Sequence, residues 1–235
     1  MFDYLKREQG FLFPVTLLAV MGIWGIALTT PSPVPDFARV GNVQEKKEAF
    51  FTYLKPHVDA VNEEIEKDRE RLLGSQGSFW DQLQNRRIIL QYLNSDLHDE
   101  DELIKRVDQV PASLALIQAA KESGWGSSRF AREGFNFFGQ QCFERGCGFT
   151  PRNRSLGLRH EVAKFKSVRA SVRSYIHNLN THPQYEDFRV QRAQLRETGQ
   201  PLSGITLANG LERYSERGLA YVQEIQGMIR SNNLE

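Results

Sequence analysis

The stretch that decides the fold reads "ALIQAAKESGWGSSRFAREGFNFFG", residues 115–139. Its first half follows Pro111 and is rich in Ala, Leu and Ile, which predicts a helix with an apolar surface on more than one side. Gly124 suits the left-handed cap that ends many helices. Glu122 therefore lies in the last turn of the predicted helix. The partial negative charge of a helix C-terminus disfavours a second negative charge there.

The position of Glu122 is suited to acid catalysis. If the side chain is also partly buried, burial and the helix terminus both raise its pKa. A carboxyl group with a raised pKa is what a general acid needs near neutral pH. The alternative is an exposed glutamate that pairs with Lys121 or Arg129. Composition alone does not decide between the two.

The whole stretch resembles the signature of the bacterial glucosaminidase domain, glycoside hydrolase family 73, and in particular its Bax-like branch. Members of that family carry an alanine-rich helix, then E-S-x-W/Y-G, a short helix and N-x-F-G. The matching positions here are Glu122, Ser123, Trp125 and Gly126, followed by Asn136, Phe138 and Gly139. The resemblance runs from about Val107 to Ile229. Upstream, "KKEAFFTYLKPHVDAVN" is similar to the helical arm of the Bax-like branch.

The resemblance implies an α+β fold that is mainly α: a lysozyme-like domain with a small β-hairpin lobe. It implies an endo-β-N-acetylglucosaminidase that hydrolyses β-1,4 bonds after N-acetylglucosamine in peptidoglycan. Glu122 would be the general acid, and no cofactor or metal is implied. Trp125 and Phe138 would line sugar subsites, with core packing as the alternative. Asn136 would either cap a turn or bind an acetamido group.

The sequence offers three candidates for a second catalytic group. Glycoside hydrolysis usually requires two carboxylates. Many relatives carry a second glutamate in the lobe, and the resemblance assigns that position to Glu161, with an ordinary strand residue as the alternative. Tyr214 falls on the first tyrosine of the last family motif, although its neighbours depart from that motif. The acetamido group of the substrate is a third candidate, because it replaces the protein nucleophile in some glycosidases.

The two cysteines, Cys142 and Cys147, are separated by four residues. A metal site would require two further ligands, and the nearest histidines, His160 and His177, do not form a ligand-like pair. If the chain is exported, a local disulfide is the simpler interpretation. Two free thiols are the alternative.

Residues 1–30 are predicted to be a cytoplasmic tip and a membrane anchor. An uncharged run from Phe11 to Leu28 follows Lys6 and Arg7. As a helix this run would be about 27 Å long, close to the thickness of a bilayer core. The basic flank predicts a single-pass inner-membrane protein with its catalytic domain in the periplasm. A signal peptide cleaved after Ala27 is the alternative.

Three further regions follow the anchor. Residues 31–42 contain three prolines and predict an extended linker. Residues 43–100 predict a helical arm before a catalytic domain at 101–235, and Pro56 should kink or break the first arm helix. Five apolar residues recur in that helix at helical spacing: Phe51, Leu54, Val58, Val61 and Ile65. The repeat is too short to indicate a coiled coil, so packing against the domain is the favoured interpretation.

Composition limits the other functions. Lys+Arg number 30 and Asp+Glu 29, a net charge of +1 that gives no indication of a nucleic-acid partner. A lytic transglycosylase also uses one glutamate in an E-S motif, but its usual "G-L-M-Q" segment is absent and "NFFGQ" stands there instead. An inactive glycan-binding envelope protein is a third hypothesis. Cleavage of the chitobiose core of N-glycans is another activity that the resemblance suggests. Protein partners are not indicated.

Overall fold

The computed structural model describes residues 33–75, 79–93, 99–150 and 160–235, all of which belong to one compact unit, Pro31–Glu235. The predicted anchor at residues 1–30 lies outside the described residues. Among the residues that are described, no helix is both long and apolar enough to cross a bilayer.

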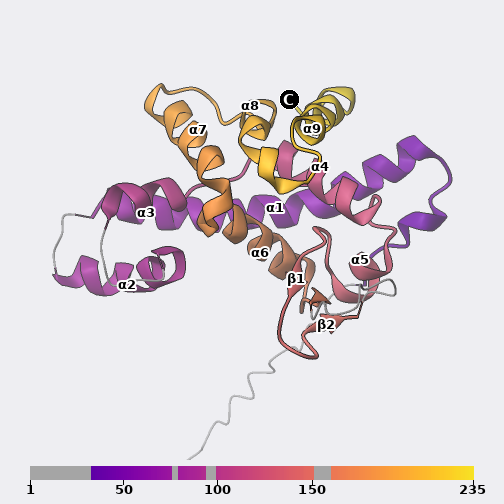
Figure 1. Cartoon of the computed structure of the whole chain (residues 1–235), viewed down its shortest axis with the longest axis horizontal. Helices are drawn as coiled ribbons and strands as arrows, with labels where there is room; N and C mark the ends of the chain where they lie inside the picture. The colour runs from indigo at the N-terminus through magenta and orange to yellow at the C-terminus, as the bar shows by residue number, and fades with distance from the viewer. Residues whose placement is uncertain (1–32, 76–78, 94–98, 151–159) are drawn as a thin grey trace, which may run out of the picture. The chain divides into compact units, whose positions relative to one another are not determined.

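The first long helix, α1, spans Val43–Leu73. The Asn42 side chain caps it by accepting a hydrogen bond from the Glu45 backbone N–H at 2.8 Å. The helix lies against α4 (Ala112–Ser123) and α6 (Val168–Thr181) (Figure 1). Its buried stripe consists of Phe50, Leu54, Val58, Val61 and Ile65. The arm helix therefore packs on the domain, and residues of the predicted arm and domain share one hydrophobic core.

Pro56 does not break α1, which was one of the two effects expected of it. The helix runs through this residue from Val43 to Leu73. A proline inside a helix removes one backbone hydrogen bond and disfavours the helix by about 3 kcal/mol. The neighbouring side chains Leu54 and Val58 are fully buried. Because burying one such side chain contributes about 1.5–3 kcal/mol, packing of the stripe offsets that loss.

The central helix of the unit is α4, whose residues are almost all buried. It packs between α1 and the C-terminal helix α9 (Leu219–Ser231). Gly124 caps α4 in the left-handed conformation, with φ 59° and ψ 50°, as the sequence predicts. A short helix, α5 (Arg129–Gly134), follows. The other helical segments are η1 (Phe37–Arg39), α2 (Phe79–Leu93), α3 (Glu100–Arg106), η2 (Pro183–Tyr185), α7 (Glu186–Glu197), α8 (Gly204–Leu207) and η3 (Ala208–Tyr214).

A small antiparallel sheet replaces the predicted hairpin. Its strands are β1 (Gln141–Cys142), β2 (Gly148–Phe149) and β3 (Glu161–Ala163), in the order β1-β3-β2. The later strand β3 lies between the two earlier ones, with Cys142 opposite Glu161 and Phe149 opposite Val162. The lobe is therefore three-stranded, because the strands on either side of the cysteine loop each pair with β3 rather than with each other.

Phe37, in the described part of the predicted linker, belongs to the hydrophobic core. Phe37 is fully buried and packs edge-on against Phe50, with ring centroids 5.6 Å apart. Gly126 makes room for it. A β-carbon at Gly126 would lie 2.8 Å from Phe37 Cε2 and closer still to Cδ2. The expectation of an extended spacer is thus wrong at Phe37, which lies in η1. Burial of its aromatic ring outweighs the preference of the nearby prolines for an extended backbone.

Candidate active site

Glu122 is held by the turn that ends α4. The Ser123 hydroxyl donates to the Ala119 carbonyl at 2.6 Å and accepts from the Gly126 N–H at 2.8 Å. The Trp125 N–H donates to the Ala120 carbonyl at 2.7 Å. Together these hydrogen bonds fix the chain direction immediately after Glu122. The E-S-G-W-G sequence therefore forms one rigid turn with the carboxylate at its start.

The Glu122 side chain reaches solvent on one side and faces Gly139 on the other. A β-carbon at Gly139 would lie 3.8 Å from Glu122 Oε2, so the end of the N-F-F-G segment borders the carboxyl group. Partial burial is the main cause that raises the pKa of Glu122. The charge of Lys121 lowers this pKa, and the smaller effect of Glu224 raises it. The arrangement favours the protonated acid, in line with the sequence-based expectation for this helix terminus.

A network of buried tyrosines lies near this carboxyl group. Gln118, one turn before Glu122 on α4, is fully buried. Its Nε2 donates to the Tyr221 hydroxyl at 2.9 Å, and its Oε1 accepts from the Tyr175 hydroxyl. Burial is the main cause that raises the pKa of Tyr221, and the charge of Glu122 contributes to that rise. The tyrosine hydroxyls therefore stay protonated and able to donate hydrogen bonds.

Tyr214 belongs to the same group of side chains. Its ring stacks on Tyr221 with centroids 5.4 Å apart and planes 13° apart, and it lies 5.9 Å from the ring of Tyr185. Burial raises the pKa of Tyr214 well above its usual value, and Glu122 is among the negative groups that add to the effect. The structure thus brings Tyr214 and Glu122 into one electrostatic environment. The catalytic role of Tyr214 stays a prediction.

Sequence reasoning missed an ion-pair cluster next to Glu122. Lys121 Nζ lies 2.6 Å from Glu224 Oε1, and Arg217 Nη1 lies 2.5 Å from Glu224 Oε2. The hydrogen bond from Lys121 is the main reason that the pKa of Glu224 is lowered. Glu224 is thus a fixed negative charge on α9, opposite the end of α4. No local pattern indicates this, because α9 is distant from α4 in the sequence.

The predicted sugar-contacting aromatics are engaged within the protein. Trp125 adopts a positive φ of 58° and packs edge-on against Phe50 and Phe51, with centroids 5.7 and 5.4 Å apart. Phe138 is 3% exposed and stacks on Tyr175, with centroids 4.0 Å apart and planes 7° apart. Phe138 therefore packs against Tyr175, a member of the tyrosine network. Trp125, which is half-buried, connects the Glu122 turn to α1.

Asn136 uses its amide to tie the site to the lobe. The side chain is 1% exposed. Its Nδ2 donates to the carbonyls of Gln140 and Ala163, at 2.8 and 2.9 Å. Its Oδ1 accepts from the backbone N–H groups of Phe138 and Gln140, at 3.3 and 3.1 Å. These contacts match the turn-capping alternative for Asn136.

Glu161 lies in β3 and is 9% exposed. Its Oε1 accepts from the Gly146 N–H at 3.1 Å, and its Oε2 accepts from the Gly148 N–H at 2.8 Å. Opposite it, Cys142 and Cys147 form a disulfide with their α-carbons 6.2 Å apart. The two sulfurs and a Glu161 oxygen lie within 4.8 Å of one another. This group does not suit a metal, since zinc binds thiolates and both sulfurs are joined in the disulfide.

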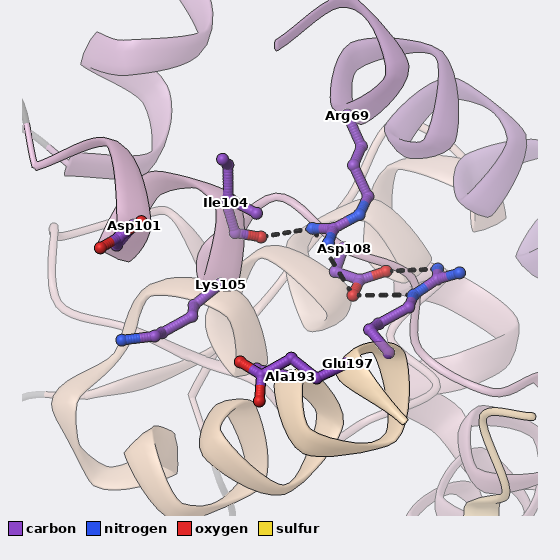
Figure 2. A pocket seen from close by; sticks show the side chains of 8 residues that line it. Arg69, Asp101, Ile104, Lys105, Asp108, Ala193 and Glu197 are labelled. Atoms are coloured by element: carbon purple, nitrogen blue, oxygen red, sulfur yellow. Dashed lines mark hydrogen bonds and ion pairs between the residues drawn. The ribbon is translucent and has the colours of Figure 1, made fainter. Parts of the chain in front are cut away.

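A separate hollow of about 310 Å³ lies away from the predicted site residues, between α1, α3 and α7 (Figure 2). Asp108 at its floor accepts from Arg196 at 2.6 and 3.2 Å, and Arg69 lies 3.7 Å away. Three basic and three acidic side chains line it, so it presents no excess of either charge. Its lining residues are Arg69, Asp101, Ile104, Lys105, Asp108, Ala193, Arg196 and Glu197.

Comparisons with known proteins agree with the resemblance read from the sequence. A family model for glucosaminidase, described as mannosyl-glycoprotein endo-beta-N-acetylglucosaminidase, matches residues 101–234. The protein is also similar to "Protein bax" of Escherichia coli (strain K12). The two are 32% identical over 210 residues, which cover 86% of this chain and 75% of that protein. No solved structure matches significantly.

Proposed function

This chain belongs to the glucosaminidase family, and from that membership we propose that it is an endo-β-N-acetylglucosaminidase acting on peptidoglycan. It hydrolyses the β-1,4 bond after N-acetylglucosamine. The observation that carries the proposal is the position of the Glu122 carboxyl group, which is exposed at the end of α4 and borders Gly139. Family membership supports the coarser assignment of a glycosidase related to peptidoglycan.

Glu122 acts as the general acid. In its protonated form it donates the proton to the glycosidic oxygen as the bond to the leaving sugar breaks. Partial burial and the helix C-terminus favour the protonated form before the reaction, and Glu224 partly offsets the opposing charge of Lys121. The solvent-facing side of Glu122 gives a glycan strand access to the acid.

We assign the role of partner to Tyr214, because the charge of Glu122 is among the causes that raise the pKa of its hydroxyl. Because burial keeps its hydroxyl protonated, Tyr214 can donate a hydrogen bond to substrate but cannot serve as a base near neutral pH. The nucleophile then comes from elsewhere. We assign that part to the acetamido group of the substrate, since both Glu161 oxygens already accept backbone hydrogen bonds.

A lytic transglycosylase reaction is the second candidate. It is favoured by the same observation, that the Glu161 carboxylate is held by the backbone of the cysteine loop. Such an enzyme needs no carboxylate to activate water. Its products end in anhydro-muramic acid, whereas hydrolysis leaves reducing N-acetylglucosamine ends.

The deciding experiment is mass spectrometry of isolated peptidoglycan after digestion by the purified full chain. We expect reducing N-acetylglucosamine ends from the unchanged protein and no products from Glu122→Gln. Glu133→Gln, at an exposed glutamate on the nearby α5, is the matched control and should retain cleavage. Anhydro-muramic ends would establish the transglycosylase instead. Absence of products from the unchanged protein would reject both enzymes and favour a glycan-binding role.

We also propose that the domain works outside the cytoplasm. The Cys142–Cys147 disulfide supports this, because disulfides persist in oxidising compartments. Thiol labelling of the protein in intact cells tests it. Both cysteines should resist labelling until a reductant is added, and labelling without reductant would contradict the proposal.

A further inference from the structure

Phe143 is the most exposed large apolar residue of the described part of the chain, with 78% of its surface accessible. Among the strongly exposed large apolar residues there, it is the only aromatic. One exposed phenylalanine is common on protein surfaces and requires no special account. The loop that carries Phe143 is what distinguishes it.

That loop, Cys142–Cys147, is held at several points. The disulfide joins its ends, and the Cys147 N–H donates to the Glu144 carbonyl at 3.2 Å. The buried Glu161 carboxylate accepts N–H groups from Gly146 inside the loop and Gly148 just after it. Hydrogen bonds to a charged acceptor are among the stronger ones in proteins. A short exposed segment thus has little freedom to move, and the loop presents the Phe143 ring in a restricted position.

The loop is also connected closely to Glu122. Gly139, beside the Glu122 carboxyl group, precedes Phe143 by only four residues, a span of at most about 14 Å. The chain between them is held at its start, because Asn136 binds the Gln140 backbone through two hydrogen bonds. Phe143 therefore lies on the lobe next to the site, a short distance from the acid.

We propose that Phe143 binds the glycan strand at a position beyond the bond that is cleaved, with its ring packed on the apolar face of a sugar. Glu161 and the Cys142–Cys147 disulfide are positioning groups that hold the loop for this contact. The inference rests on the proposed function for its substrate. It departs from the prediction that Glu161 is a base, since it gives that carboxylate a role in binding.

A lipid surface is the competing partner for an exposed phenylalanine. The loop does not favour it. Phe143 is followed directly by Glu144 and Arg145, so the segment has no excess of basic residues and no second apolar residue beside the ring. Aromatic residues that line ligand sites, in contrast, commonly act singly among polar groups.

Binding is measured first, in the Glu122→Gln background so that the strand is not consumed. The probe is a soluble, uncrosslinked peptidoglycan strand. Phe143→Ala should weaken its binding about tenfold, the effect expected for losing the burial of an aromatic ring. Phe143→Trp keeps an aromatic face and should restore affinity. Leu73→Ala, at a residue 59% exposed at the end of α1, is the matched control and should bind normally.

Cleavage by the otherwise unchanged protein then separates positioning from chemistry. Glu161→Gln and Cys142→Ser/Cys147→Ser should raise KM for long strands severalfold while kcat is largely retained. If Glu161 were a catalytic base, Glu161→Gln would instead lower kcat strongly with little change in KM. The penalty of Phe143→Ala should also be greater for long strands than for the shortest strand that is cleaved.

The outcomes distinguish this inference from the proposed function. Equal strand binding by Phe143→Ala and its parent overturns the inference, even if peptidoglycan cleavage is established. If the Glu122→Gln parent protein binds no strand, the inference is overturned as well. A parent that binds strands through Phe143 but cleaves none supports the inference and rejects the hydrolase. Loss of binding to phosphatidylglycerol vesicles alone, with strand binding intact, would assign Phe143 to a membrane surface instead.

Discussion

Gly139 faces the Glu122 carboxyl group, so that a β-carbon on the glycine would lie 3.8 Å from Oε2. Gly139 also adopts a positive φ of 65°. The end of the N-F-F-G segment therefore approaches the acid without covering it with a side chain. The two motifs of the sequence signature meet at this point, and the environment of Glu122 depends on both.

The pH dependence of cleavage should respond to Glu224. Catalysis requires protonated Glu122, so the rate falls as pH rises through the pKa of that carboxyl group. Glu224→Gln removes a negative charge that raises the pKa of Glu122. The substitution also frees Lys121 from its ion pair, and the charge of Lys121 lowers the pKa of Glu122. Both changes shift the alkaline limb of the kcat/KM profile to lower pH. Glu216→Gln, at an exposed residue of the preceding loop, is the control. An unmoved limb in Glu224→Gln would show that the two carboxyl groups are not coupled.

Replacing the proposed acid should stabilise the fold near neutral pH. The pKa of Glu122 is raised in the folded state, mainly by burial, so ionising it costs folding free energy above its unfolded-state pKa. Glu122→Gln carries no charge and should have a higher Tm than the unchanged protein at pH 7. The difference should shrink as pH falls below about 4, where the glutamate is protonated in both states. Thermal unfolding followed by circular dichroism measures it, and a lower Tm at pH 7 would contradict the expectation.

The packing of Phe37 on Gly126 can be tested against a neighbouring glycine. Gly126→Ala and Gly124→Ala both place a side chain at positive φ, which costs about 1–2 kcal/mol. Only the first also drives a β-carbon into the Phe37 ring, since nothing lies within 4 Å of the corresponding atom at Gly124. Gly126→Ala should therefore lower the free energy of unfolding by at least about 1 kcal/mol more. Urea denaturation measures both, and equal losses would mean that Phe37 is not seated there.

The Gln118 hydrogen bonds should be required for stability, which urea denaturation measures. Gln118→Leu keeps the size of the side chain but leaves the hydroxyls of Tyr175 and Tyr221 without this partner. We expect a loss of about 2–4 kcal/mol in the free energy of unfolding, because two buried polar groups lose a hydrogen bond. Tyr221→Phe removes one hydroxyl and should cost less. If Gln118→Leu is as stable as the unchanged protein, the network does not hold these tyrosines.

Local patterns in the sequence predicted the features that depend on neighbouring residues. The α4 helix and its Gly124 cap are confirmed, because propensity and capping act within a few residues. The arm helix buries the expected stripe, although Phe50 occupies the position expected of Phe51. Family membership, predicted from the residues around Glu122, is confirmed by the comparisons.

Other features arise from contacts between distant segments, which periodicity does not reveal. The order of the sheet depends on β3, which inserts between two strands that are close in sequence. The continuity of α1 through Pro56 depends on the core that forms around it. The anchoring of Phe37 depends on the space left by Gly126, a residue of the distant E-S-G-W-G turn.

The sequence by itself determined the family, the identity of the candidate acid and the helix end that holds it, since each is encoded in one short motif. Only the tertiary structure decided the surroundings of that acid. The charge of Glu224 and the tyrosines joined by Gln118 come from segments far apart in the chain. The pKa of a carboxyl group depends on burial and on charges in space. Those are set when α4 and α9 pack together.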